Sequence, residues 1–254
     1  MKKLLSAVAC TLLFASGANA DFLRLEAGAG AWQQTPTGGL TANTGSFTGK
    51  DVSTEKEQTN AYAWVMFKHF IPIIPNLRVE YATVKSDGVA TGSFANFTAT
   101  STPSALEIKQ YDLIPYYNLL DNTAWLTLDV GIDIKMIDMS NTADNVTLRV
   151  PTATASTSYS DSKMIPIPMA YARTRFQIPM TGLGFEADGK YISYSDTTVY
   201  DARAKIDYTF NITPIIQPGI EIGYRVQKFE SNDLDNVNLN IEFKGVYAGL
   251  MVRF

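Results

Sequence analysis

The residue types that most often carry enzymatic or metal chemistry are scarce in this chain. Among 254 residues there is one histidine, His69, and one cysteine, Cys10. Protein zinc sites use three or four nitrogen, sulfur or oxygen ligands, and nucleophilic catalysis needs a nucleophile, a base and a group that orients the base. His69 alone supplies none of these sets. We interpret His69 as an interfacial turn residue and predict no catalytic residue, no metal site and no cofactor.

Two further patterns resemble ligand-binding motifs. Glycines recur in AGAGAW (27–32) and GLGFEADGK (182–190), but neither segment opens a helix, as a phosphate-binding loop must. We expect these small residues to face a narrow lumen. The acidic segment SNDLDN (231–236) lacks the spacing and the closing glutamate of a calcium loop. We interpret it as a solvated outer loop.

Charged residues follow a different rule, because they alternate with apolar ones. In segment 124–136, Leu128 and Ile132 have one parity, whereas Asp129, Asp133 and Lys135 have the other. A period of two residues is typical of a β-strand with two unlike faces. Similar segments recur about ten times along the chain, an even number of strands as in bacterial single-chain barrels. The pattern predicts an all-β fold.

The composition agrees with apolar residues that alternate with polar ones along the chain. Hydrophobic residues make up 46% of the chain, yet the mean hydropathy is −0.03. The formal charge is −4, and loss of Lys2 and Lys3 with a leader peptide would make it two units more negative. An acidic chain of this kind is a poor partner for nucleic acid.

The first residues read MKKLLSAVACTLLFASGANA. Two lysines, a short apolar run and the small residues Ala18 and Ala20 are typical of a secretory signal peptide. We predict that residues 1–20 are cleaved before Asp21 and that residues 21–254 form one domain exported through the periplasm. The apolar run is shorter than the roughly 20 residues of a membrane-spanning helix.

The connections between the predicted strands are alternately long and short. Long Gly/Ser/Thr/Asn-rich stretches occupy 35–58, 86–104 and 139–161, and short ones occupy 70–76 and 118–122. Transmembrane barrels with both termini in the periplasm have long outer loops and short periplasmic turns. The sequence therefore predicts an antiparallel up-and-down transmembrane β-barrel of about ten strands.

The chain ends in GVYAGLMVRF, an alternating strand up to its last residue. It resembles the signal by which the barrel assembly machinery recognises outer-membrane proteins of Gram-negative bacteria. The residues assigned to this signal are Val246, Ala248, Leu250, Val252 and Phe254. Upstream, Leu239, Ile241 and Phe243 have the opposite parity. We expect a β-bulge near Lys244 and Gly245 to account for this phase change.

The whole chain, with DFLRLEAGAGAW (21–32), IPIIPNLRVEY (71–81) and GKYISYSDTTVYDARAKIDY (189–208), resembles a family of single-domain outer-membrane β-barrels of unknown function. The resemblance implies a location in the outer membrane and brings no catalytic residues. It also implies contact with outer-membrane lipid and lipopolysaccharide, and with the barrel assembly machinery and periplasmic chaperones during biogenesis. Ten-stranded outer-membrane proteases use acidic residues and a histidine at the outer rim, where this sequence offers no histidine.

Charged residues of the inward parity define a predicted lumen network. Its basic members are Arg24, Arg78, Lys135, Arg173, Arg175, Lys190, Arg203, Lys205, Arg225 and Arg253. Its acidic members are Glu26, Glu80, Asp112, Asp129, Asp133, Glu186, Asp188, Asp201, Asp207 and Glu221. The two signs balance, as a self-paired network requires, and a barrel of about ten strands is near the size at which side chains fill the interior.

These features predict a structural or surface-interaction barrel with a charge-paired, plugged lumen. A narrow pore for small solutes or ions is the alternative, and an outer-membrane enzyme is a remote one. Acidic residues of the outer loops could bind divalent cations beside anionic headgroups. They are Asp51, Glu55, Glu57, Asp87, Asp138, Asp144, Asp161, Glu230, Asp233 and Asp235.

Overall fold

The computed structural model describes residues 23–44, 47–94, 97–123, 125–148, 156–213, 215–234 and 237–254. The predicted signal peptide, residues 1–20, lies outside these ranges. The strands are β1 (Leu23–Thr44), β2 (Phe47–Ser53), β3 (Gln58–His69), β4 (Asn76–Phe94), β5 (Phe97–Thr123), β6 (Leu126–Leu148), β7 (Ser156–Gln177), β8 (Leu183–Tyr194), β9 (Thr197–Thr209), β10 (Gln217–Leu234) and β11 (Val237–Arg253). In the described part of the chain no helix is long and apolar enough to cross a membrane.

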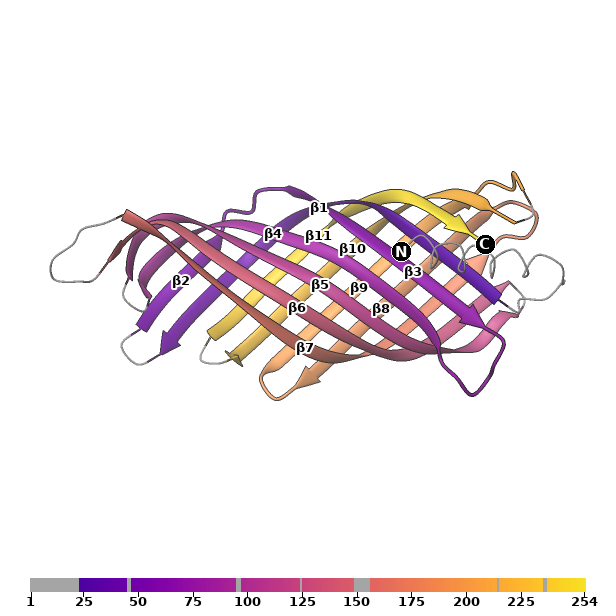
Figure 1. Ribbon diagram of the computed structural model, residues 1–254, viewed down its shortest axis with the longest axis horizontal. Helices are drawn as coiled ribbons and strands as arrows, with labels where there is room; N and C mark the ends of the chain where they lie inside the picture. Colours follow the sequence, from indigo (N-terminus) through magenta and orange to yellow (C-terminus); the bar gives the residue numbers. More distant parts are fainter. Residues whose placement is uncertain are drawn as a thin grey trace, which may run out of the picture.

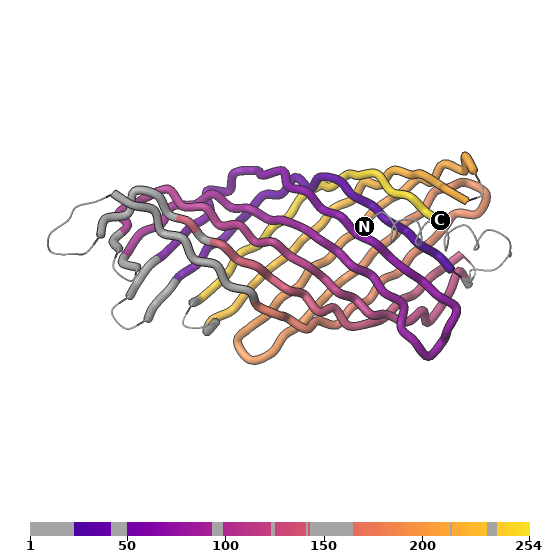
Figure 2. Tube along the Cα trace, in the orientation of Figure 1, coloured from indigo at the N-terminus to yellow at the C-terminus, as the bar shows by residue number. Residues whose placement is uncertain are grey.

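The strands close into a barrel and are inclined to its long axis (Figure 1). From β4 to β11 each strand pairs antiparallel with the next, and β11 pairs with β1 through partners such as Leu250 and Ala29. Figure 2 shows the chain running around the barrel in sequence order until the first and last strands meet. Each of β2 and β3 pairs with both β1 and β4, so they share one position. Eleven described strands thus occupy ten positions, and the predicted barrel of about ten strands is confirmed.

The shared position is interrupted at residues 54–57. Glu55 has a φ of 59°, and Asp87 of β4 holds the interruption in place. Its backbone oxygen accepts hydrogen bonds from the backbone nitrogen of Thr54 at 2.9 Å and from Thr54 Oγ1 at 3.1 Å. Its carboxylate accepts one from Gln58 Nε2 at 2.8 Å. This segment therefore works as a local bulge within the wall.

The barrel has two unlike ends. We call the end where β1 begins and β11 finishes the terminal end, and the opposite one the distal end. The sequence predicts long loops at the distal end, and this prediction is wrong in extent. Most of the predicted loop residues belong to strands: β1 continues to Thr44, β4 to Phe94 and β6 to Leu148. Polar hairpins rich in Thr and Ser still satisfy their backbone groups by pairing. The polar composition of these segments therefore does not indicate loops.

The two faces of the wall exchange character partway along the barrel. On β6 the outward residues are apolar from Leu128 to Met136, and the next outward residue is Asp138. The inward residues change in the opposite sense, from buried Lys135 to buried Ile137. The terminal half is therefore charged inside and apolar outside. The distal half is mostly apolar inside, with a few buried polar side chains such as Asp51 and Ser104, and mostly polar outside.

This exchange corrects the expected bulge on β11. Pairing with β10 runs without a shift through Lys244↔Val226 and Gly245↔Arg225. Ile241 and Phe243 are buried inside, whereas Val246 is 48% exposed on the outer face. The apolar parity changes because apolar residues move from the outer face to the inner one, while the strand itself continues regularly.

The outer apolar band has the dimensions of a membrane-spanning wall. Its run on β6, Leu128 to Met136, is about the 9–11 residues that a tilted transmembrane strand needs. Exposed aromatic residues border the band, as in transmembrane barrels. Near the terminal end they include Tyr117, Trp125, Phe176, Phe210 and Phe254, and on the distal side they include Tyr111, Tyr191 and Tyr224. The strands are longer than the band: β5, with 27 residues, extends far beyond it.

Candidate functional site

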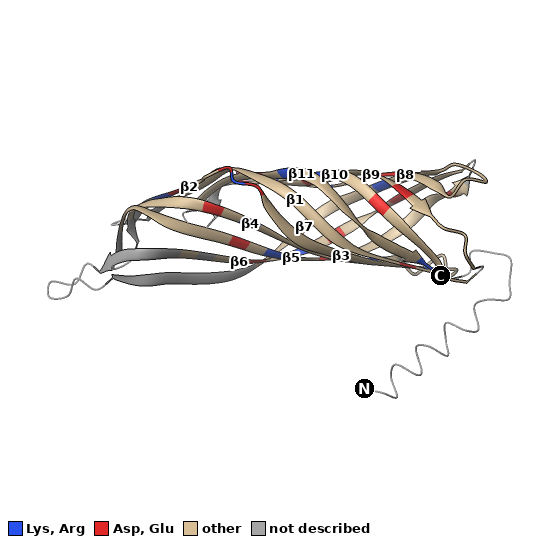
Figure 3. Ribbon diagram, turned by 90° about the horizontal axis from the view of Figure 1, so that it is seen from above, with Lys and Arg blue, Asp and Glu red and all other residues tan. Residues whose placement is uncertain are grey.

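The inward charged residues of the terminal half form the main candidate site, which we call the lumen network. All of the predicted members except Arg24 are buried, and Arg24 is partly exposed at the terminal mouth. Figure 3 shows blue and red positions on the strands of the wall, and residues of opposite charge are register partners on neighbouring strands. This arrangement follows from strand register: Asp188 lies beside Arg173 on one side and Arg203 on the other.

Lys190 lies at the centre of the network. Its Nζ donates to Glu80 Oε2 at 2.7 Å and to the carboxylate of Asp112. Lys135 Nζ contacts the same Asp112 at 2.8 Å and Asp201 Oδ2 at 3.4 Å. The two lysines, each 0% exposed in the side chain, are thus bridged by one carboxylate, and removing either would leave buried acid groups undercompensated.

Arg203 shows the specificity of the pairing. It donates to both carboxylate oxygens of Asp188, at 2.7–3.1 Å, and to Glu80 Oε1 at 2.6 Å. Glu221, another acid of the network, bonds elsewhere: it accepts from Lys205 Nζ and Tyr62 Oη, both at 2.8 Å. Which buried acid meets which base depends on shear and side-chain length, which parity alone does not contain.

Aromatic side chains complete the network. Trp64 Nε1 donates to Glu221 Oε1 at 3.0 Å, and its ring lies 4.6 Å from Lys205 Nζ and 5.2 Å from the Arg78 guanidinium. Cations over an aromatic face gain further attraction. Gly28 makes room for this ring, because a Cβ there would lie 2.6 Å from it. The expectation that AGAGAW supplies small residues to a narrow lumen is confirmed at this position.

A layer of amides closes the distal side of the network. Gln110 and Gln227 face each other across the lumen, with Nε2 to Oε1 distances of 2.6 and 2.7 Å. Gln227 also donates to Asp201 at 3.1 Å, and Arg225 donates to both oxygens of that carboxylate. Polar groups without charge thus separate the charged layers from the apolar ones.

Beyond the amides the interior is filled by apolar side chains, which we call the apolar cap. Its buried members are Val84, Leu106, Ile108, Ile137, Val199, Phe229, Leu239, Ile241 and Phe243. Sequence reasoning missed this cap, because it assigned every apolar residue of a strand to the outer face. The signal was present: the parity change on β11 marks where the apolar face turns inward.

A few buried polar atoms in the described network have no hydrogen-bond partner. Both carboxylate oxygens of Asp133 are of this kind, although Lys190 Nζ lies 3.7 Å away. The others in the network are Glu26 Oε1, Arg173 Nε and Arg253 Nε. The network is therefore tightest around Glu80, Asp112 and Asp201 and less complete near its ends.

Those of the predicted acidic loop residues that the structure describes lie in different surroundings. Asp51 faces inward and is buried, Asp87 holds the 54–57 segment, and Glu230 pairs with Lys228 at 2.6 Å. Among the described residues no three His, Cys, Asp or Glu side chains lie close enough to hold a metal ion. Asp235, and the side chains of Asp144, Asp161 and Asp233, lie outside the described part of the structure.

His69 ends β3 at the terminal end. Its Nε2 lies 3.2 Å from the backbone oxygen of Pro75, and its Nδ1 accepts from the backbone nitrogen of Ile71 at 3.1 Å. Both ring nitrogens are thus engaged by the β3–β4 turn. This geometry agrees with the interpretation of His69 as a turn residue.

The proposed assembly signal lies on the outer face of the closing strand. Leu250 is 71% exposed and Phe254 is 40% exposed, and the two strand ends are tied by Phe254 N donating to Leu25 O at 2.9 Å. These residues therefore contribute apolar surface to the outer band where the barrel closes.

The chain shares its fold with outer-membrane β-barrels of known structure. The outer membrane protease OmpT from Escherichia coli aligns over 94% of this chain and 99% of its own, with 7% identity and a TM-score of 0.52. The translocator domain of the autotransporter NalP from Neisseria meningitidis aligns over 100% and 96%, with 13% identity and a TM-score of 0.41. Neisserial surface protein A aligns over 93% and 100%, with 12% identity and a TM-score of 0.33. No protein-family model and no curated protein sequence matches the chain.

At such identities the likeness concerns the fold alone. It supports an antiparallel β-barrel fold and no narrower family. The described interior offers paired charges, an amide layer and an apolar cap. Chemically, this arrangement can close a lumen and hold the wall rigid.

Proposed function

We propose that this protein is an integral outer-membrane β-barrel that is closed to ions and anchors a water-exposed β-extension at the cell surface. The observation that carries the proposal is the exchange of faces. Lipid favours apolar residues outside a barrel wall, and water favours polar ones. The terminal half therefore suits a bilayer, and the distal half suits an aqueous surface, where it would contact lipopolysaccharide or a surface partner.

Two barriers in series support a closed lumen. An ion would first have to displace the buried pairs of Lys135 and Lys190 and then cross the apolar cap around Phe229 and Phe243. Buried pairs resist disruption because an unpaired charge costs several kcal/mol. Apolar constrictions exclude ions by remaining dry. The cap is thus a second barrier that does not depend on charge.

Planar-bilayer recording of the mature barrel tests the closed lumen. We expect no steady conductance from the unmodified protein. Arg203→Ala with Asp188→Ala, or Phe229→Ala with Phe243→Ala, should add little, because each pair leaves one barrier intact. All four substitutions together should give measurable current, and Ile134→Ala, on the outer face, is the matched control. A stable, large conductance from the unmodified barrel would favour the narrow pore instead.

Labelling on whole cells tests the orientation. A single cysteine at Asn240, on the distal outer face, should react with a membrane-impermeant maleimide. One at Thr181, in the terminal turn between β7 and β8, should react only after the envelope is opened. The reverse result would invert the barrel and remove the proposed surface role.

A further inference from the structure

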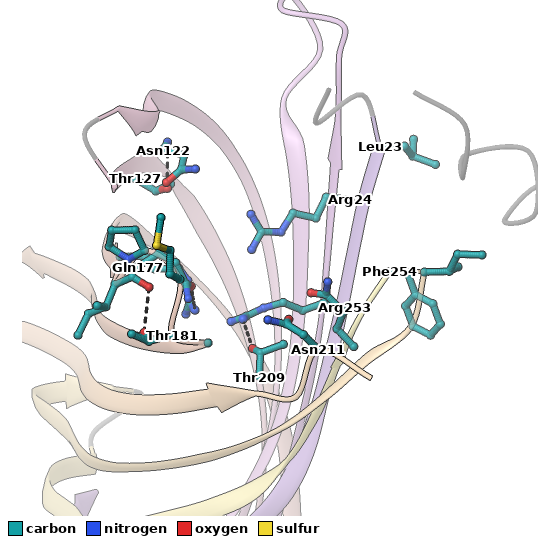
Figure 4. A pocket seen from close by; sticks show the side chains of 17 residues that line it. Leu23, Arg24, Asn122, Thr127, Gln177, Thr181, Thr209, Asn211, Arg253 and Phe254 are labelled. Carbon is teal, nitrogen blue, oxygen red and sulfur yellow. Dashed lines mark hydrogen bonds between the residues drawn. The ribbon is translucent and has the colours of Figure 1, made fainter. Parts of the chain in front are cut away.

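The lumen opens at the terminal end into a polar vestibule of about 480 Å³. Its wall contains three arginines together with the amides and hydroxyls of several turns and strand ends, and no aspartate or glutamate. Figure 4 shows Arg24 and Arg253 extending into this space from β1 and β11, with Asn122, Gln177 and Thr209 around it. The vestibule thus combines three guanidinium groups with amide and hydroxyl groups, beside apolar side chains such as Met180 and Ile215.

The three arginines of the vestibule are paired with acids that lie behind its wall. Arg24 Nε lies 2.5 Å from Glu26, and Arg253 Nε lies 3.3 Å from the same carboxylate. Arg253 also pairs with Asp207 at 3.1 Å, and Arg175 donates to both oxygens of Asp207. Three guanidinium groups therefore share two side-chain carboxylates placed behind the wall.

A third side-chain acid, Glu186, lies deeper in the lumen network. Glu186 lies 3.3 Å from Arg175, but it is also bound by Arg173 at 2.6 Å and Lys205 at 3.4 Å. Its charge is therefore shared with cations deeper in the lumen network.

Donor groups remain available for a ligand. Among the described residues Glu26 is the only ion-pair partner of Arg24, and it is bound through Nε, so the terminal nitrogens of Arg24 extend into the vestibule. Arg253 is 7% exposed, and its terminal nitrogens already donate to Thr209 and Asp207. Arg24 is the more accessible of the two, with 29% of its side chain exposed.

We propose that the vestibule binds a small ligand that bears oxyanions, either carboxylates or phosphates, entering from the end where the chain terminates. The planar guanidinium group matches both kinds of oxyanion through paired N–H donors. The volume of the vestibule falls within the range of ordinary small-molecule sites. This site is separate from the distal surface and does not depend on whether the lumen conducts.

Isothermal titration of the folded mature barrel in detergent micelles tests the site. Citrate probes carboxylate binding and inorganic pyrophosphate probes phosphate binding, while sorbitol and spermidine serve as neutral and cationic comparisons. We expect saturable binding of at least one oxyanion and none of sorbitol or spermidine. The stronger of the two oxyanions identifies the ligand class.

Variants locate the binding. Arg24→Gln should weaken it about tenfold, because a charge-assisted hydrogen bond is lost, and Arg24→Lys should weaken it less. Asn211→Asp places a negative charge on the exposed rim of the vestibule and should weaken it without disturbing buried residues. Lys244→Gln, on the distal outer face, is the matched control and should bind as the unmodified barrel does.

Heat-modifiable gel mobility verifies that each variant is folded, and Asn211→Asp still decides the outcome if Arg24→Gln fails to fold. The proposal is wrong if neither oxyanion gives saturable heat up to about 10 mM, a range that covers millimolar affinities. It is equally wrong if binding survives both vestibule substitutions unchanged or is lost in Lys244→Gln.

Discussion

The two halves of the barrel solve opposite solvation problems with one continuous wall. On β11, the outward residue Leu250 of the terminal half is 71% exposed, whereas the inward residue Ile241 of the distal half is 2% exposed. The same kind of side chain thus faces opposite ways, only nine positions apart in the sequence. The difference teaches that an alternating pattern locates a face only when the surrounding solvent is known.

The interiors differ accordingly in how they are held together. The terminal half depends on directional pairs, such as Arg203 with Asp188, whose partners must be complete. The distal half depends on apolar side chains such as Phe243, whose contribution grows with buried area. In the terminal half, loss of one charged partner should therefore leave the other buried and unpaired. In the distal half, loss of an apolar side chain should leave a cavity.

The largest expected effect comes from placing a charge on the outer face of the terminal half. Leu250→Arg should prevent assembly altogether, because an arginine in the middle of the lipid-facing band costs about 2–4 kcal/mol and, in addition, disrupts the strand pairing that closes the barrel. Asn240→Arg, on the same face of the same strand, should assemble normally in water. Heat-modifiable mobility in outer-membrane fractions measures both. Equal assembly of the two variants would break the distinction between the halves.

Removing one member of a buried pair should have the next largest effect. Arg203→Met should destabilise the folded barrel by about 3–5 kcal/mol, because Asp188 and Glu80 would lose a buried cation. Arg203→Met combined with Asp188→Leu should recover part of this loss. Urea unfolding in lipid vesicles measures both free energies. A double variant as unstable as the sum of the single ones would show that the two residues act independently.

Trimming the apolar cap should act mainly on the distal half. Ile241→Ala should cost about 2–5 kcal/mol through lost burial and the cavity left behind. Amide hydrogen exchange should accelerate in the distal hairpins while the terminal half keeps its protection. Asn240→Ala, the outward neighbour on the same strand, is the control. Uniform acceleration along the barrel would mean that the halves unfold as one unit.

The smallest effect concerns Asp51, a buried acid of the distal half. Gly88 makes room for its carboxyl, since a Cβ there would lie 2.2 Å from Asp51 Oδ1, and burial raises the pKa of this carboxyl above its usual value. A raised pKa means that the stabilising, neutral form is lost as pH rises through the folded-state pKa. Asp51→Asn should therefore raise the urea midpoint at pH 7, and this gain should vanish near pH 4. A gain that persists at low pH would assign the effect to packing.

Much of this architecture is legible in the sequence, because strand periodicity is local. The inward parity of Arg24, Asp133 and Arg225 follows from alternation alone. Their partners do not, since pairing across the lumen depends on tilt and register around ten positions. The apolar cap was missed because a one-dimensional pattern does not mark where bilayer gives way to water. The Thr-rich hairpins resemble loops in the sequence, because a polar composition alone does not distinguish a water-exposed strand from a loop.

The exchange of faces is tested most directly by measuring depth in the bilayer along β11. Single cysteines replacing Leu250, Val246, Glu242 and Asn240 can each be labelled with a fluorophore, because the chain's one cysteine, Cys10, falls in the predicted leader. Brominated lipids should quench the labels at Leu250 and Val246, and iodide in water should quench those at Glu242 and Asn240. Lipid quenching at all four positions, or at none, would contradict a boundary between Val246 and Glu242.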